Sequence, residues 1–224
     1  MRRKLIHALF RFLFSLLTKM EVHGIENIPE QGAFIIVSNH LGILDPPLVF
    51  AVLDSQDLTA FIAKKHKRNP IFRWFVNGVG GIWLNRIGVD TLAFREAKKL
   101  LENGGALGIA PEGTRSPTHA LIQAKTGAAY LVDKTRTPVI PLAITGTENA
   151  ESKILRLQRP RITVKIGEPF ILPPINKENR TRDLQQNTDE IMCRIAVLLP
   201  PAYRGVYANH PRLLALSDDD NYLS

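Results

Sequence analysis

The chain has 224 residues, of which 45% are hydrophobic and 22% charged, so one folded domain with its own core is expected and a disordered protein is excluded. Its single cysteine, Cys193, excludes an intramolecular disulfide and a cysteine-rich zinc site. The formal net charge is +8, and five basic residues without an acid lie in the first twenty positions. The rest of the chain is therefore close to neutral, which does not fit a nucleic-acid-binding protein. The basic end favours contact with an anionic surface.

The first twenty residues predict a helix with two different faces. Leucine, isoleucine and phenylalanine cover one face, and the opposite stripe is polar, with Lys4, His7, Arg11, Ser15 and Thr18. Arg11 in the middle would cost about 2.5 to 3.5 kcal/mol inside a bilayer, which disfavours a spanning helix. It also interrupts the apolar stretch that a signal peptide needs. We therefore expect residues 1–20 to form an amphipathic helix at a membrane interface, with a helix packed on the core as the alternative.

Residues 21–205 alternate short apolar runs with helical patterns. The runs are apolar throughout, which is typical of strands covered on both faces. They are residues 33–38, 59–63, 81–84, 106–110, 139–144 and 162–166. The helical patterns are residues 46–53, 70–77, 90–102, 121–134 and 183–199. This alternation predicts an α/β domain in which helices flank a mostly parallel mixed sheet, followed by a solvated tail over residues 206–224.

Several common catalytic motifs are missing from the sequence. It contains no G-x-S-x-G, no phosphate-binding P-loop, no H-E-x-x-H and no G-x-G-x-x-G. Cys193 falls inside the last expected helix without an obvious base near it in the sequence. Catalysis by a nucleophilic side chain is therefore not indicated.

The candidate chemistry lies in Asn39–Asp45, directly after the strand that ends at Ser38. Sites in open α/β sheets form at the carboxyl ends of strands. In a turn there, Asp45 can accept a hydrogen bond from one ring nitrogen of His40, which leaves the other nitrogen to act as a base. The alternative is structural, because an aspartate before a proline is also typical of a helix N-cap.

Three further blocks place polar or cationic residues at strand ends. They are Gly80–Arg86, Pro111–Ser116 and Val139–Leu142. An arginine presents a rigid fork that suits a phosphate, although Arg86 alone could equally be a surface residue and Pro111–Ser116 a plain turn.

The four blocks, in this order, resemble those of the glycerolipid acyltransferases typified by 1-acylglycerol-3-phosphate acyltransferase. That family carries N-H-x₄-D, a strand G-x-[IVF]-x-x-x-R, [FV]-P-E-G-T-R-S and a V-I-P-like strand, and the resemblance extends over about residues 20–170. The chain departs from the family's pattern in the apolar Leu41–Leu44 and in Ala110, which replaces the usual Phe or Val. These departures leave open which acceptor and chain length fit.

The resemblance implies a role for each matching residue. His40 is expected to be the general base and Asp45 the residue that orients it. The acceptor is expected to contact Arg86, Glu112, Gly113, Thr114 and Arg115, and Pro141 to shape the pocket. Lys64 is the best candidate in the basic run 64–68 to extend the phosphate site, with a solvated basic loop as the alternative.

The implied reaction moves a fatty acyl chain from coenzyme A or acyl carrier protein to a lysophospholipid hydroxyl, first of all that of 1-acylglycerol 3-phosphate. The thioester is already activated, so no metal or organic cofactor is expected. Alternative acceptors are glycerol 3-phosphate, another lysophospholipid or a lyso-aminolipid. A catalytically silent membrane-binding protein is the alternative outside enzymes. We expect peripheral attachment to the cytoplasmic face of the cell membrane and no nucleic-acid partner.

Overall fold

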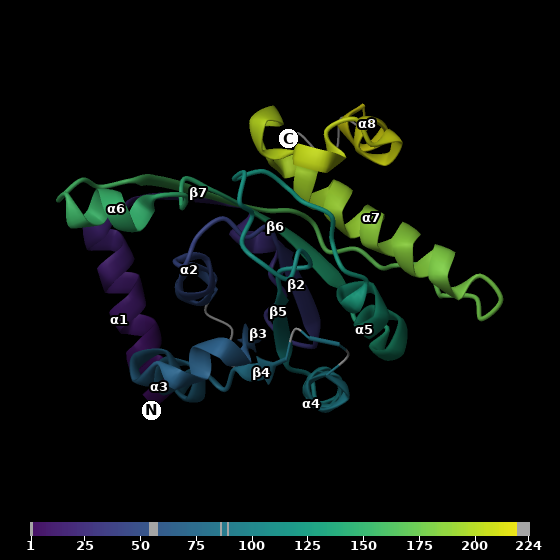
Figure 1. The fold of residues 1–224 in the computed structure, drawn as a ribbon, viewed down its shortest axis with the longest axis horizontal. Helices are drawn as coiled ribbons and strands as arrows, with labels where there is room; N and C mark the ends of the chain where they lie inside the picture. The colour runs from purple at the N-terminus through teal and green to yellow at the C-terminus, as the bar shows by residue number, and fades with distance from the viewer. Residues whose placement is uncertain (1, 54–57, 86, 89, 219–224) are drawn as a thin grey trace.

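The structure, a computed structural model, describes residues 2–53, 58–85, 87–88 and 90–218, which form a sheet with helices on both faces (Figure 1). The seven strands of these residues have the order β1-β7-β6-β2-β5-β3-β4, in which β6 and β7 are antiparallel and the other neighbours parallel. This confirms the α/β fold with a mostly parallel mixed sheet. The strands are β1 (Lys19–His23), β2 (Phe34–Ser38), β3 (Leu58–Ala63), β4 (Ile82–Leu84), β5 (Ala106–Ile109), β6 (Val139–Thr145) and β7 (Arg161–Ile166).

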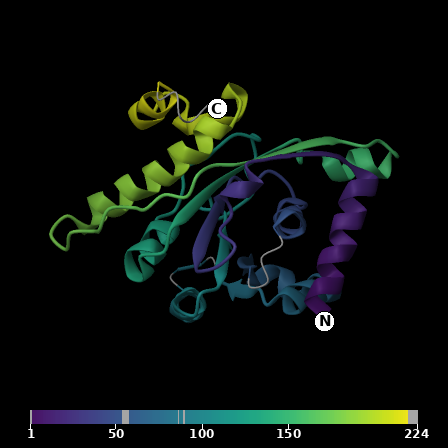
Figure 2. The ribbon, with the colours of Figure 1, turned by 180° about the vertical axis from the view of Figure 1, so that it is seen from behind.

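The helices cover the two faces of this sheet in separate groups. Figures 1 and 2 show α7 and α8 on one side of the sheet, and α1 and α2 on the other. The helices are α1 (Arg2–Leu17), α2 (Asp45–Val52), α3 (Pro70–Val79), α4 (Thr91–Glu102), α5 (Gly127–Thr135), α6 (Ala150–Leu155), α7 (Arg180–Leu198) and α8 (Pro211–Ser217). A short 3₁₀ helix, η2 (Lys64–Arg68), follows β3.

Strand β2 explains why the apolar runs are continuous. Ile35 and Val37 belong to the core that includes α4, α5 and α7, whereas Phe34 and Ile36 belong to the core under α1 and α2. Successive side chains of a strand point to opposite faces, so a strand covered on both sides needs an apolar residue at every position.

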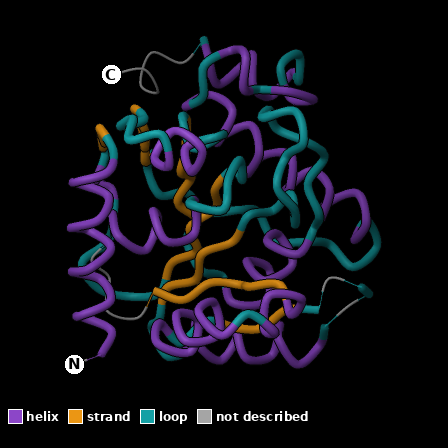
Figure 3. The backbone as a smooth tube through the Cα atoms, turned by 60° about the vertical axis from the view of Figure 1, so that its left-hand side comes forward, coloured by secondary structure: helices purple, strands orange, loops and turns teal. Residues whose placement is uncertain are grey.

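Helix α1 packs on the core and also exposes an apolar row. Figure 3 shows it along the outer side of the molecule, beginning at the N-terminus. Ile6 and Phe14 are buried, whereas four large side chains face outward, namely Leu5, Leu9, Phe12 and Leu16. The expected polar stripe is only partly exposed, because His7 contacts the ring of Phe50 and Thr18 is buried. Among the described helices, none is long and apolar enough to cross a membrane.

The end of the chain differs from the expected solvated tail. Residues 206–217 include α8 and contribute Tyr207, Leu213 and Leu216 to the core shared with α7. The apolar pattern of this segment is short, and it is interrupted by Pro211 and followed by three aspartates, so the sequence alone does not indicate a buried helix. The expected helix 121–134 is also shorter, since residues 121–125 are not helical and α5 begins at Gly127.

Candidate active site

His40 follows the carboxyl end of β2, in the middle of the sheet. The chain leaves β2 through α2 on one face and leaves the neighbouring β5 towards β6 through α5 on the other face, and sites form at such switch points. Asn39 fixes the turn, because its amide donates to the carbonyl of Ile144 and its oxygen accepts from the amide of Ile144, both at 2.8 Å. The side chain of Asn39 thus extends the pairing of β2 with β6 by one position.

The side chains of His40 and Asp45 are in direct contact. Nδ1 of His40 lies 2.8 Å from Oδ2 of Asp45, and the same oxygen accepts from the backbone amides of Leu41 at 2.6 Å and Gly42 at 2.8 Å. The N-cap position of α2 is Leu44, so the carboxylate bonds back into the turn instead of capping the helix. With Nδ1 engaged, Nε2 is the nitrogen that can take a proton from a substrate.

The loop after β5 holds the backbone of His40 from the other side. Glu112 Oε1 accepts from the amide of His40 at 2.9 Å, and Ser116 donates its amide to the carbonyl of His40 at 2.8 Å. Glu112 is 2% exposed, and this burial, with a smaller contribution from the Asp45 carboxylate, raises the pKa of Glu112 to about 7. Hydrogen bonds to the backbone of His40 therefore join the two segments 39–45 and 111–116.

Two glycines let these segments come close. A Cβ on Gly42 would lie 2.7 Å from the carbonyl oxygen of Thr147, so a side chain there would push the turn away from the end of β6. Gly113 has a φ of 70°, in the left-handed region that favours glycine. The glycine in the apolar Leu41–Leu44 stretch is therefore required by packing.

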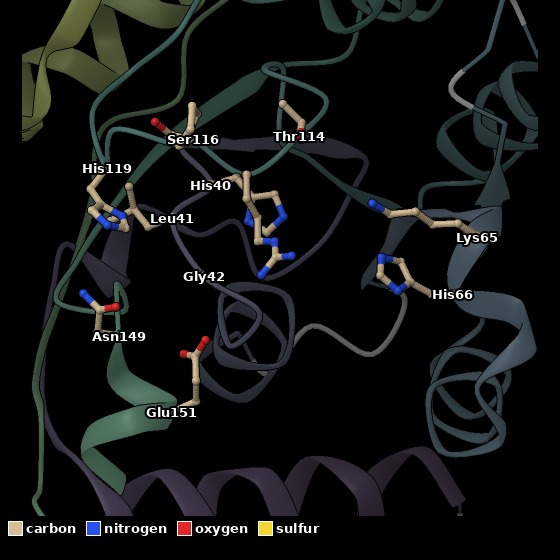
Figure 4. A pocket seen from close by; sticks show the side chains of 12 residues that line it. His40, Leu41, Gly42, Lys65, His66, Thr114, Ser116, His119, Asn149 and Glu151 are labelled. Carbon is tan, nitrogen blue, oxygen red and sulfur yellow. The ribbon is translucent and has the colours of Figure 1, made fainter. Parts of the chain in front are cut away.

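His40 lies in a cavity of about 370 Å³ whose ends differ in charge (Figure 4). Lys65 and His66, from η2, lie on one side of His40 in this view, and His119, Asn149 and Glu151 lie on the other. The remaining described residues of the lining are Leu41, Gly42, Thr114, Arg115, Ser116 and Pro117. The volume is that of a typical small-ligand pocket.

Of the residues expected from the sequence to bind substrate, Thr114 and Arg115 line the cavity. Lys64 instead forms an ion pair with Asp90 at 2.9 Å, and its neighbour Lys65 reaches the cavity. The pKa of Asp90 is lowered to about 2 by hydrogen bonds from the backbone amide of Asn85, the side chain of Lys64 and the backbone amide of Ala93. Arg86 lies outside the described residues.

Three other expected residues are not among those that line the cavity. Glu112 is turned towards backbone amides, Gly113 forms the turn, and Pro141 is buried in β6 opposite Val37 of β2. Conversely, His119, Asn149 and Glu151 line the cavity although no motif pointed to them. His119 and Asn149 both have φ near 60°, a strained conformation that only the fold reveals.

Cys193 takes no part in this site. It is fully buried in α7 with its sulfur 3.3 Å from Nδ1 of His210, and burial raises the pKa of its thiol to about 12. Among the described residues, no three His, Cys, Asp or Glu side chains come together as metal ligands.

The sequence of this chain is similar to a family of known proteins. The family model described as Acyltransferase matches residues 19–145. A 1-acyl-sn-glycerol-3-phosphate acyltransferase of Borreliella burgdorferi is 31% identical over 58% of this chain and 53% of its own length. Mouse 1-acyl-sn-glycerol-3-phosphate acyltransferase alpha is 28% identical over 82% of this chain and 62% of its own length.

The fold of this chain is also similar to that of a solved structure. The crystal structure of the 1-acyl-sn-glycerophosphate (LPA) acyltransferase from Thermotoga maritima is similar, with a TM-score of 0.64 and 27% identity over 83% of this chain and 76% of that one. The chain spans about half the length of the B. burgdorferi relative. Because the family model covers more than half of the chain, including His40, Asp45 and the 111–116 loop, the chain belongs to the acyltransferase family.

Proposed function

We propose that this protein transfers a fatty acyl chain from a thioester to the free hydroxyl of a lysophospholipid, with 1-acylglycerol 3-phosphate as the first candidate acceptor. The observation that carries the proposal is the contact between His40 and Asp45 at the edge of a cavity with cationic groups at one end. The relatives' names support the acceptor class, and acyl-coenzyme A and acyl carrier protein are the candidate donors.

The proposed step needs one base and no enzyme nucleophile. The hydroxyl oxygen of the acceptor attacks the thioester carbonyl as Nε2 of His40 takes the hydroxyl proton. The carbon–sulfur bond then breaks, and the thiolate leaves as a thiol with the proton from the imidazolium. Asp45 stabilises the charged ring and holds its orientation.

The cationic end of the cavity is proposed to hold the acceptor's phosphate. Lys65 supplies positive charge there, and Arg115, which lines the same cavity, has a fork that matches two phosphate oxygens. Lys64 and Arg86 stay candidates, although Lys64 would have to leave Asp90 first.

The opposite end favours a second candidate acceptor. Glu151 and Asn149 line the cavity there, and among the described residues Oε2 of Glu151 is buried without a hydrogen-bond partner. A carboxylate suits an ammonium group better than a phosphate. A lyso-aminolipid is therefore the second candidate, and the two acceptors can be separated by assay.

We propose that the protein acts as a peripheral enzyme at the cytoplasmic face of the cell membrane. The outward row of α1, with Leu5, Leu9, Phe12 and Leu16, sits beside the exposed Lys4 and Arg11, which suits an anionic lipid surface. Both the acceptor and the product of the proposed reaction are membrane lipids, so attachment there would supply the substrate.

The decisive experiment supplies labelled palmitoyl-coenzyme A or palmitoyl-acyl carrier protein with four acceptors in mixed micelles. The acceptors are 1-acylglycerol 3-phosphate, glycerol 3-phosphate, lysophosphatidylcholine and a lyso-aminolipid, and His40→Ala is the control. We expect acylation of the phosphate acceptor by the natural protein and its loss in His40→Ala. Release of free fatty acid alone, or equal product in His40→Ala, would contradict the proposal.

A further inference from the structure

We infer that Glu112 is a positioning residue for the base His40 and does not bind the acceptor. This inference rests on the proposed function, because it assigns the glutamate a task in the same reaction. The resemblance of the sequence implied the opposite task, contact with the acceptor, and the contacts of the side chain argue against that.

Both carboxylate oxygens of Glu112 are taken by backbone amides. Oε1 accepts from the amide of His40 at 2.9 Å, and Oε2 accepts from the amide of Ile122 at 3.1 Å. The side chain is buried, and the described residues that line the cavity include Thr114–Pro117 but not Glu112. A substrate in the cavity would therefore meet the neighbours of Glu112 and not its carboxylate.

The backbone of His40 is held at both of its polar groups by the same loop. Glu112 accepts a hydrogen bond from the amide of His40, and Ser116 donates its own amide to the carbonyl of His40. Figure 4 shows His40 and Ser116 from these two segments near one another at the cavity. His40 and Ile122 both lie outside helices and strands, so the carboxylate replaces the ladder of bonds that a sheet would provide.

The ring of His40 is fixed by a different residue. Asp45 holds Nδ1, while Glu112 and Ser116 hold the peptide, so the base is fixed at its ring and at its backbone independently. Displacement of a catalytic group by about 1 Å can cost about 10²-fold in rate. Loss of the Glu112 contact should therefore slow the chemical step, while the cavity surface that binds the acceptor stays in place.

Glu112→Gln is the sharpest test, because it keeps the shape but puts an amide NH₂ against one of the two backbone N–H groups. We expect kcat to fall by about 10- to 100-fold, with KM for 1-acylglycerol 3-phosphate and for palmitoyl-coenzyme A within about threefold of the natural protein. Glu190→Gln is the matched control, since Glu190 is a part-buried carboxylate on α7 held by Arg194 and Arg212. It should lose stability without losing kcat.

Three results would overturn the inference. One is a tenfold rise in the acceptor KM of Glu112→Gln with kcat retained, which would make Glu112 a ligand. Another is an unchanged kcat and KM, which would remove any role. The third needs no variant: fast amide exchange of His40 and Ile122 in the natural protein, because both amides should be protected by Glu112. Failure of the natural protein to acylate any acceptor would instead overturn the proposed function.

Discussion

The site around His40 has two sides that are built in different ways, one of buried carboxylates outside the cavity lining and one of exposed side chains that line the cavity. Asp45 and Glu112 are 3% and 2% exposed. Asp45 accepts hydrogen bonds from two backbone amides and contacts the ring of His40, and Glu112 accepts hydrogen bonds from two backbone amides. Lys65, Thr114 and Arg115 are exposed side chains on a short 3₁₀ helix and a turn. The comparison suggests that the groups for the chemical step are fixed before substrate arrives, whereas the groups for the acceptor can adjust to it.

The largest effect is expected from Asp45→Asn on the fixed side. The amide oxygen of asparagine can replace Oδ2 and keep the bonds from Leu41 and Gly42, and its NH₂ would take the place of Oδ1, which has no partner among the described residues. The fold should survive while the charge that stabilises the imidazolium is lost. We expect turnover to fall on the order of 10³-fold, measured with labelled palmitoyl-coenzyme A.

The matched control for this variant is Asp133→Asn. Asp133 also accepts from a backbone amide, that of Ile175, but lies on α5 away from the cavity. Its turnover should stay within twofold of the natural protein. If Asp45→Asn kept both its melting temperature and its turnover, Asp45 would be only a turn residue and the contact with His40 would have no catalytic value.

The second effect is on stability, and it comes from Glu112. A carboxyl group whose pKa is about 7 in the folded state and about 4.5 when unfolded destabilises the fold as pH rises between these values. The difference corresponds to about 3 kcal/mol, fully present above pH 7 and absent below about pH 4.5. Between pH 4.5 and pH 8, the free energy of unfolding of Glu112→Gln, measured in urea, should therefore rise by about this amount relative to that of the natural protein. A constant difference across this range would show that the carboxylate titrates normally.

The third effect tests the adjustable side with Arg115→Lys. Lysine keeps the charge but loses the planar fork, so about one charge-assisted hydrogen bond is lost. We expect KM for 1-acylglycerol 3-phosphate to rise about tenfold with little change in kcat. Arg182→Lys, an exposed arginine on α7, is the control and should leave both constants unchanged. An unchanged KM in Arg115→Lys would remove Arg115 from the phosphate site.

The same comparison explains how far the sequence could be read. Hydrophobic runs predicted β2, β5 and β6 within one residue at each end, and the motif spacing brought His40 and Asp45 together. The orientation of Glu112 depends on the amide of Ile122, ten residues away in an irregular loop, and no pattern predicts where such a side chain points. Asn149 and Glu151 reach the cavity only because β6 ends beside β2, which is a property of the topology.

The smallest effect concerns α1, where a single substitution is a better test than a deletion. Deleting residues 2–19 would also remove the buried Ile6 and Phe14, so a loss of membrane binding could follow from damage to the core. Phe12→Ser avoids this, because Phe12 is 61% exposed. Placing about half of such a side chain in a lipid interface contributes about 1.4 kcal/mol, so sedimentation with anionic vesicles should weaken about tenfold. Leu92→Ser is the control, since Leu92 is 69% exposed on α4. Equal weakening in both variants, or none in Phe12→Ser, would mean that α1 is not the surface that meets the membrane.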